Sequence, residues 1–189
     1  LTNGAAGQYR VAINVLTPTT FVSGVIGSGV LIKTSETISK EGDPQERIEL
    51  GIGFASILAI PIFFGAIAMP GDIVTTIYGP QYRTAGTLLV GLAGYKLLET
   101  QTDQLMSTLS GFDRPDLRFY ISVGVLVTNV GLGVALLNEI GIVGVVIATL
   151  VTGLLEWMAA LYLVHRLMSF RLFPNPIRMQ FLAGVAMFG

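Results

Sequence analysis

Long stretches without a charged side chain alternate with short polar stretches along the chain. Three stretches contain no Asp, Glu, Lys or Arg at all, namely residues 11–32, 50–71 and 119–138. Each is about 20 residues long, which is the length that a helix needs to cross a hydrocarbon core of about 30 Å. The pattern therefore predicts three helices that span a membrane.

Three weaker segments complete this pattern. Residues 140–164 are interrupted only by Glu156, residues 84–106 are apolar at first but contain three charged residues, and residues 177–189 are largely apolar. The last segment is too short to cross the bilayer and the chain begins with Leu1, so we expect a fragment of a longer protein. The sequence predicts an all-α fold, a polytopic bundle of about six transmembrane segments.

Two of the predicted helices contain an internal proline, Pro18 and Pro61. Proline removes a backbone donor, but inside a membrane the freed carbonyl can be satisfied by a neighbouring helix or by a hydroxyl side chain. We interpret both prolines as kinks. The alternative is that each proline marks a true break that lines a cavity.

The composition favours a membrane protein and excludes several other classes. Charged residues make up 12% of the chain and hydrophobic residues 52%, whereas a soluble domain has about 25% charged residues. The net charge of -1 gives no basic surface for nucleic acid. The chain has no Cys and a single His, His165, so it offers neither thiolate nor multi-histidine ligands. We expect no metal and no cofactor.

None of the familiar catalytic or nucleotide-binding motifs occurs in the sequence. The chain lacks G-x-S-x-G, H-E-x-x-H, the Walker-type G-x-x-x-x-G-K-S/T and G-x-G-x-x-G. Hydrolase, metalloprotease, ATPase and dinucleotide-binding functions therefore lack their characteristic residues. We predict that the protein is not an enzyme.

Basic residues are distributed unevenly between the two sides that the predicted helices define. One side receives eight Lys and Arg residues, in residues 33–49, 107–118 and 165–178. The other side receives only Arg10 and Arg83, in residues 1–10, 72–83 and a turn near residue 139. Because Lys and Arg gather in cytoplasmic loops, we predict a multi-pass protein of the cell membrane with the first group of connections in the cytoplasm.

Several connections resemble those of a known transporter family. The relevant segments are Gly7-Gln8-Tyr9, IYGPQY at 77–82, SGFDRP at 110–115, a helix containing Asn129, and IGIVGVVIATLVTG at 140–153. In this order and spacing they resemble the carboxy-terminal half of the polysaccharide and O-antigen flippases, within the multidrug/oligosaccharidyl-lipid/polysaccharide exporter superfamily. The resemblance runs to about residue 165.

This resemblance implies a fold and a function. Residues 1–189 would form most of the carboxy-terminal lobe of a two-lobed transporter whose amino-terminal lobe is absent from this chain. The transporter would move a polyprenyl-linked oligosaccharide across the membrane by alternating access, for polysaccharide or glycan biosynthesis. The alternatives are a cation-coupled multidrug antiporter of the same superfamily, a membrane-embedded glycan polymerase or ligase, and a purely structural membrane subunit.

One predicted helix carries charges on a single face. Lys96, Glu99 and Asp103 stand at positions i, i+3 and i+7, so they share one side of the helix, and Lys96 falls near the bilayer midplane. A charge at that depth must face protein or water. Lys96 is the candidate contact for the anionic part of the cargo, with the two carboxylates as further candidates. In the alternative interpretation Lys96 only neutralises Glu99, and Asp103 reaches the interface.

A second helix carries a stripe of small residues. Gly144, Ala148, Thr152 and Glu156 recur at every fourth position, a spacing that lets another helix approach closely. We interpret the stripe first as a helix interface, with Glu156 either lining a cavity or reaching water. Asn14 and Asn129 are interpreted as donors of hydrogen bonds between helices.

The predicted topology can be tested with single cysteines in the parent protein in intact cells. We expect an impermeant thiol reagent added from outside to label position 78 and to leave positions 40 and 114 unlabelled, because the basic connections are predicted to be cytoplasmic. Labelling at 40 and 114 without labelling at 78 would show that the predicted orientation in the membrane is inverted.

Overall fold

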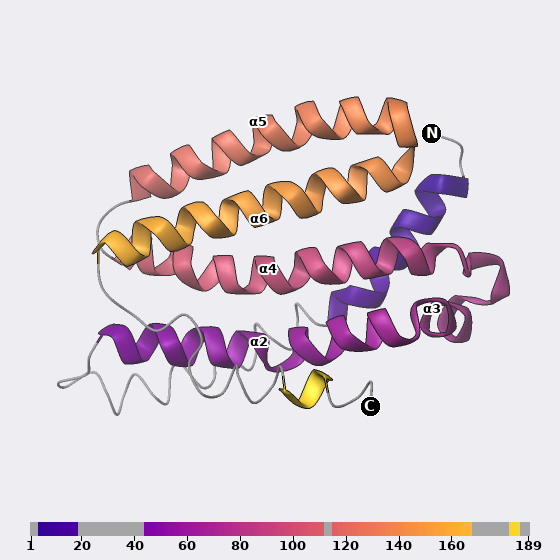
Figure 1. The fold of residues 1–189 in the computed structure, drawn as a ribbon, viewed down its shortest axis with the longest axis horizontal. Coiled ribbons are helices and arrows are strands. Elements are labelled where there is room, and N and C mark those ends of the chain that lie inside the picture. Colours follow the sequence, from indigo (N-terminus) through magenta and orange to yellow (C-terminus); the bar gives the residue numbers. More distant parts are fainter. Residues whose placement is uncertain (1–3, 19–43, 112–114, 168–181, 186–189) are drawn as a thin grey trace.

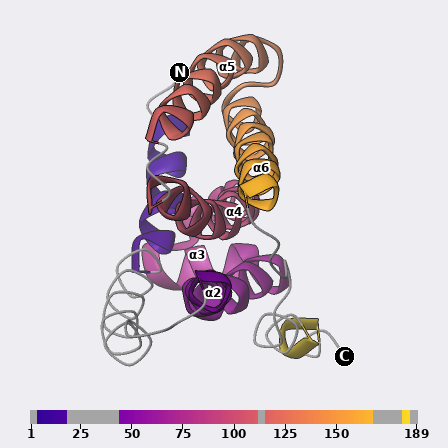
Figure 2. The ribbon, with the colours of Figure 1, turned by 90° about the vertical axis from the view of Figure 1, so that its left-hand side faces the viewer.

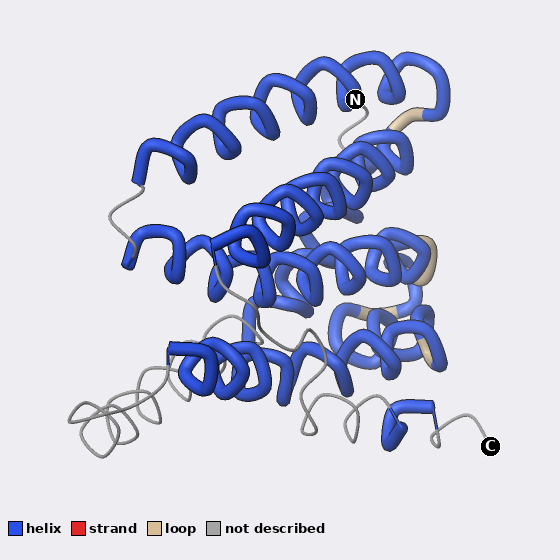
Figure 3. The backbone as a smooth tube through the Cα atoms, turned by 60° about the vertical axis from the view of Figure 1, so that its left-hand side comes forward, coloured by secondary structure: helices blue, strands red, loops and turns tan. Residues whose placement is uncertain are grey.

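The computed structural model describes residues 4–18, 44–111, 115–167 and 182–185, and almost every residue in these ranges is helical (Figure 1). The helices are residues 4–18, α2 (Pro44–Ala68), α3 (Pro70–Tyr78), the short 3-10 helix η1 (Pro80–Tyr82), α4 (Ala85–Gly111), α5 (Pro115–Ile140), α6 (Ile142–Leu167) and residues 182–185. Figure 3 shows no strand in the described part of the chain. The predicted all-α class is therefore confirmed for these residues.

Helix α4 lies at the centre of the arrangement. It packs against α2 on one side and α6 on the other, and it also contacts α3 and α5. Helix α5 packs on the far side of α6, so that α2, α4, α6 and α5 follow one another across the bundle (Figure 1, Figure 2). The helix over residues 4–18 crosses α4 obliquely.

The connections between helices gather at the two ends of the bundle. Figure 1 shows the start of the helix over 4–18, helix α3 and the α5–α6 turn at one end. The starts of α2 and α5 and the ends of α4 and α6 lie at the other. The structure thus groups the connections as the counting of basic residues did, while the side of the membrane that each group faces stays a prediction.

Two helices of the described chain are long and apolar enough to cross a membrane. They are Asp116–Ile140 and Ile142–Arg166, which contain the predicted segments 119–138 and 140–164. A third span results if Ala59–Ala68 and Pro70–Tyr78 are taken together, although the chain bends by 96° between them. Helix α4 covers the predicted segment 84–106 but is not among these spans. The total of about six segments stays a prediction.

Several helices extend beyond the predicted membrane segments. Residues 4–10 are helical, although they were expected to form a connection. The expected connection 72–83 contains most of α3 and all of η1, and α2 begins at Pro44 inside the polar stretch 33–49. Charge marks where a helix leaves the hydrocarbon, and a helix can continue beyond that point. Most of the predicted segments 11–32 and 177–189 lies outside the described residues, since only 11–18 and 182–185 are described.

Helix α2 passes through Pro61 without interruption and ends at Ala68. The chain breaks at Met69, and Pro70 then occupies the first position of α3, where the missing N–H is not needed. The helix therefore breaks just before Pro70 and not at Pro61, the proline predicted to kink it. Pro18 is the last described residue of its helix, so its effect lies outside the described residues.

The small-residue stripe of α6 faces α5. A Cβ built on Gly144 would lie 2.3 Å from the carbonyl oxygen of Leu136 in α5, so only glycine permits this approach. Ala148 is fully buried. Farther along, the Asn129 amide donates a hydrogen bond to Thr152 Oγ1 at 2.7 Å, and Thr152 in turn donates to the Ala148 carbonyl at 2.8 Å. Asn129 thus forms the interhelical bond expected of it.

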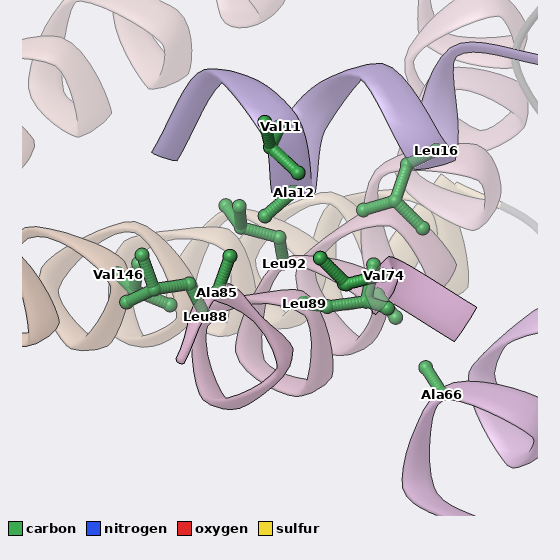
Figure 4. Packing of buried hydrophobic residues seen from close by; sticks show 11 residues of the cluster. Val11, Ala12, Leu16, Ala66, Val74, Ala85, Leu88, Leu89, Leu92 and Val146 are labelled. Atoms are coloured by element: carbon green, nitrogen blue, oxygen red, sulfur yellow. The ribbon is translucent and has the colours of Figure 1, made fainter. Parts of the chain in front are cut away.

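Two clusters of buried hydrophobic residues lie at the contacts between the helices. One joins α2, α4 and α6, and it consists of Ala59, Ile60, Leu97, Leu105, Met106, Ala160 and Val164. The other joins the helix over 4–18, α3 and α4, and it also includes Ala66 of α2 and Val146 of α6 (Figure 4). By contrast, only 6% of the apolar window of α5 is buried within this chain. Such a broad apolar surface fits lipid or another part of the protein.

The contact at Gly144 can be tested with a matched pair of glycine substitutions. We expect Gly144→Ala to destabilise the protein by about 1–3 kcal/mol, because α5 and α6 must separate to accommodate the methyl group. Gly124→Ala in α5 is the control, since nothing lies within 4 Å of a Cβ at that position. It should be neutral or slightly stabilising. Thermal unfolding of the parent protein in detergent measures both, and equal shifts for the two variants would contradict the close approach.

Candidate functional site

Lys96 and Glu99 form an ion pair on α4, one helical turn apart. The exposed fractions of their side chains are 21% and 31%. The Tyr95 hydroxyl donates a second hydrogen bond to Glu99, at 3.2 Å from Oε1. The carboxylate of Glu99 therefore has two neighbours on its own helix, and the pairing of Lys96 with Glu99 that the sequence offered as an alternative is present in this structure.

The position of Tyr95 depends on a glycine in the neighbouring helix. A Cβ on Gly153 of α6 would lie 2.7 Å from the Tyr95 ring, so the ring occupies space that any other residue would fill. This contact fixes the ring between α4 and α6, from where its hydroxyl reaches Glu99. Gly153 was not singled out from the sequence, because nothing in the sequence indicates which helix α6 packs against.

Lys96 lines a cavity of about 150 Å³ between three helices. The helix over residues 4–18 contributes one wall, α4 the second and α6 the third. The lining residues are Tyr9, Ile13, Leu16, Thr17, Leu92, Tyr95, Lys96 and Thr149. The wall is thus mostly apolar, with hydroxyl groups and one ammonium group. A drug-sized ligand needs about 300–1,000 Å³, so this cavity can hold only a small part of a larger molecule.

The other charged residues of the predicted site lie apart from this cavity. Asp103 is exposed and does not line it. Asp103 lies within electrostatic reach of Lys96 and Glu99 on α4, and of Arg118 on α5 and Glu156 on α6. These charges therefore form one group shared by α4, α5 and α6, and of its members only Lys96 lines the cavity. The involvement of Arg118 was not expected from the sequence.

The remaining residues of the small-residue stripe have mixed surroundings. Gly144 and Ala148 lie in the α5–α6 interface described above, and Glu156 is partly exposed. Thr152 lines a second cavity, of about 270 Å³, between α5 and α6. Within the described residues no group of His, Cys, Asp and Glu side chains has an arrangement that could hold a metal ion.

Two curated proteins of Haloferax volcanii are similar to this chain. The probable flippase AglR is 30% identical over 154 residues, which cover 77% of this chain and 32% of AglR. The probable low-salt glycan biosynthesis flippase Agl15 is 30% identical over 153 residues, which cover 79% of this chain and 32% of Agl15. The chain is a relative of these flippases.

This similarity confirms the resemblance to the flippase family that the sequence motifs indicated. The chain spans about a third of the length of the curated relatives it matches. Neither a protein-family model nor a solved structure matches it.

The hydrogen bond from Tyr95 to Glu99 yields a further prediction. Tyr95→Phe keeps the ring against Gly153 but removes the donor, so we expect a loss of about 0.5–2 kcal/mol in stability. Tyr162→Phe on α6 is the matched control, because its side chain is 65% exposed and it should have no effect. Thermal unfolding of the detergent-purified parent protein measures both variants. An unchanged melting temperature for Tyr95→Phe would show that the bond is unimportant.

Proposed function

We propose that this chain forms most of the carboxy-terminal transmembrane lobe of a flippase in the cell membrane. In this proposal the complete protein moves a polyprenyl-linked oligosaccharide from the cytoplasmic to the outer leaflet, for glycan or polysaccharide biosynthesis. Two lobes alternate between inward-open and outward-open states, and the partner lobe is the amino-terminal one. The similarity to AglR and Agl15 supports this proposal, since both are named as flippases and the name of Agl15 refers to glycan biosynthesis.

The observation that carries the proposal is the position of Lys96 in the cavity wall. Lys96 follows Ala85, the first residue of α4, by eleven residues, which places it about 17 Å along the helix. That depth is near the middle of a hydrocarbon core of about 30 Å. Charged side chains are rare at such depths and are usually associated with transport pathways.

The chemistry of the pair suits an anionic ligand that must be bound and released. Glu99 neutralises Lys96 in this structure, so neither of the two charges is left unpaired. The ammonium group of Lys96 has three N–H donors, so it can donate to a phosphate or an acidic sugar as well as to Glu99. Glu99 then keeps the hydrogen bond from Tyr95. The pair thus holds the cargo without any covalent step.

The size of the cavity limits what this lobe contributes. About 150 Å³ accommodates the charged group of a lipid-linked glycan but not its sugars. In the proposal the rest of the oligosaccharide lies between the two lobes. The hydroxyls of Thr17 and Thr149 in the cavity wall donate to the carbonyls of Ile13 and Val145, so each would have to turn away from its own helix to donate to a phosphate oxygen.

Substitutions of Lys96 test the proposed cargo contact. Lys96→Ala should abolish glycan export, whereas Lys96→Arg, which keeps the charge and changes its shape, should retain part of it. Export is measured as the appearance of the glycan at the cell surface, together with the amount of folded protein in the membrane.

The double variant Lys96→Ala with Glu99→Ala separates the two roles of Lys96. It removes both charges, so it should restore folding if Lys96→Ala is destabilising through an unpaired Glu99. Recovery of folded protein without export is the expected result. Recovery of export as well would show that Lys96 only neutralises Glu99, and the cargo contact would be withdrawn.

A further inference from the structure

Helix α3 runs in a different direction from the long helices of the bundle. The chain turns by 96° between Ala59–Ala68 and Pro70–Tyr78, and Figure 1 shows α3 at one end of the bundle, viewed nearly along its axis. A helix at right angles to a membrane-spanning neighbour lies parallel to the membrane surface. The question is which of its faces meets lipid and which meets water.

One face of α3 is occupied by the protein itself. Val74 is fully buried, and Figure 4 shows it directed toward Leu16 and Leu89. Pro70 and Tyr78, four residues before and after Val74, are partly buried on the same side. This face therefore fixes the rotation of α3 about its axis.

The exposed part of α3 has an apolar edge beside the buried face and a polar edge opposite that face. Met69, Ile73 and Ile77 form an apolar edge at a spacing of four residues. Met69 and Ile77 are 58% and 60% exposed, whereas Ile73 is half-buried and also packs against the cluster that contains Val74. The other edge carries Asp72 and Thr76, both exposed. This division of exposed apolar and polar residues is typical of a helix in the membrane interface.

The surroundings of the polar edge also fit an interface. Arg83, which follows η1, lies 3.9 Å from Asp72, and both side chains are largely exposed. The rings of Tyr78 and Tyr82 pack edge to face with centroids 6.4 Å apart. Charged residues at a polar edge and tyrosines near it are what the boundary between hydrocarbon and water selects.

Helix α2 is by itself almost long enough to cross the membrane, so α3 is not needed to complete the crossing. The uncharged residues from Leu50 to Ala68 would extend about 28 Å as a helix, which nearly equals a hydrocarbon core of about 30 Å. A span made of the end of α2 plus α3 would instead carry Asp72 into the hydrocarbon, away from water. The length and the charge together favour a complete crossing by α2.

We infer that α3 lies in the membrane interface, with Met69, Ile73 and Ile77 in contact with lipid chains and Asp72, Thr76 and Arg83 in the headgroup region. Its partner is the surface of the bilayer. This inference depends on neither the cargo nor the cytoplasmic assignment of the loops.

The interfacial position of α3 has a consequence for α4. Gly86, in the first turn of α4, is buried so closely against Pro70 that a Cβ would lie 2.7 Å from the Pro70 carbonyl oxygen. Because α3 and the start of α4 touch at the backbone, the depth of α3 in the membrane fixes the depth of α4. Lys96 is then held at a constant distance from the surface.

Spin labels on single cysteines test the inference in the complete protein, with other cysteines replaced, in phosphatidylcholine vesicles containing phosphatidylglycerol. The apolar edge is sampled at positions 69, 73 and 77, the polar edge at 72 and 76, and the buried face at 74. Each label reports its collisions with oxygen, which concentrates in hydrocarbon, and with a water-soluble nickel chelate.

The expected result is a repeat of about 3.6 residues. Labels at 69, 73 and 77 should collide mainly with oxygen, labels at 72 and 76 mainly with nickel, and the label at 74 with neither. Exclusion of nickel from both edges would place α3 inside a bent span. Exclusion of both reagents from 69, 73 and 77 would show that protein covers this edge. Either outcome overturns the inference, and gel filtration identifies any variant that has not folded.

Discussion

The described part of this chain depends on one constraint, which is that α4 carries charges into an apolar bundle. Lys96 and Glu99 neutralise each other, but their hydration must still be replaced by neighbouring groups. Helix α4 meets this demand by its central position, since it contacts α2, α3, α5 and α6. Tyr95 supplies a further polar partner for Glu99. The surrounding helices can be almost entirely apolar because α4 holds the polar groups in the middle.

Close packing around α4 and α6 is achieved mainly by glycines. Gly86 meets the backbone of Pro70, Gly91 faces Val146, and Gly153 makes room for the Tyr95 ring. Lipid chains are as apolar as the side chains, so helices in a membrane gain little from hydrophobic burial against one another. Close approach and a few hydrogen bonds replace that gain, and the Asn129–Thr152 bond between α5 and α6 is one example.

Hydropathy predicted the existence of the long helices well, because the exclusion of charge from hydrocarbon acts on every residue of a span. The helical spacing also placed Lys96 and Glu99 on one face, within hydrogen-bonding reach. The break at Met69 was missed because an apolar stretch continues across it, and the pattern does not reveal a bend. The cavity walls from Tyr9 and Thr149 were missed for another reason. These walls depend on which helices pack against one another, and the hydropathy pattern does not show which helices do so.

The α5–α6 connection consists of Gly141 alone between two helices of 26 residues each. Its positive φ of 69° suits glycine, and the chain reverses without any intervening loop. With a linker of one residue, neither helix can enter a bilayer while the other remains on the far side. Two membrane-spanning helices joined in this way would enter the bilayer as one hairpin, and the bond between Asn129 and Thr152 joins the two helices of that hairpin.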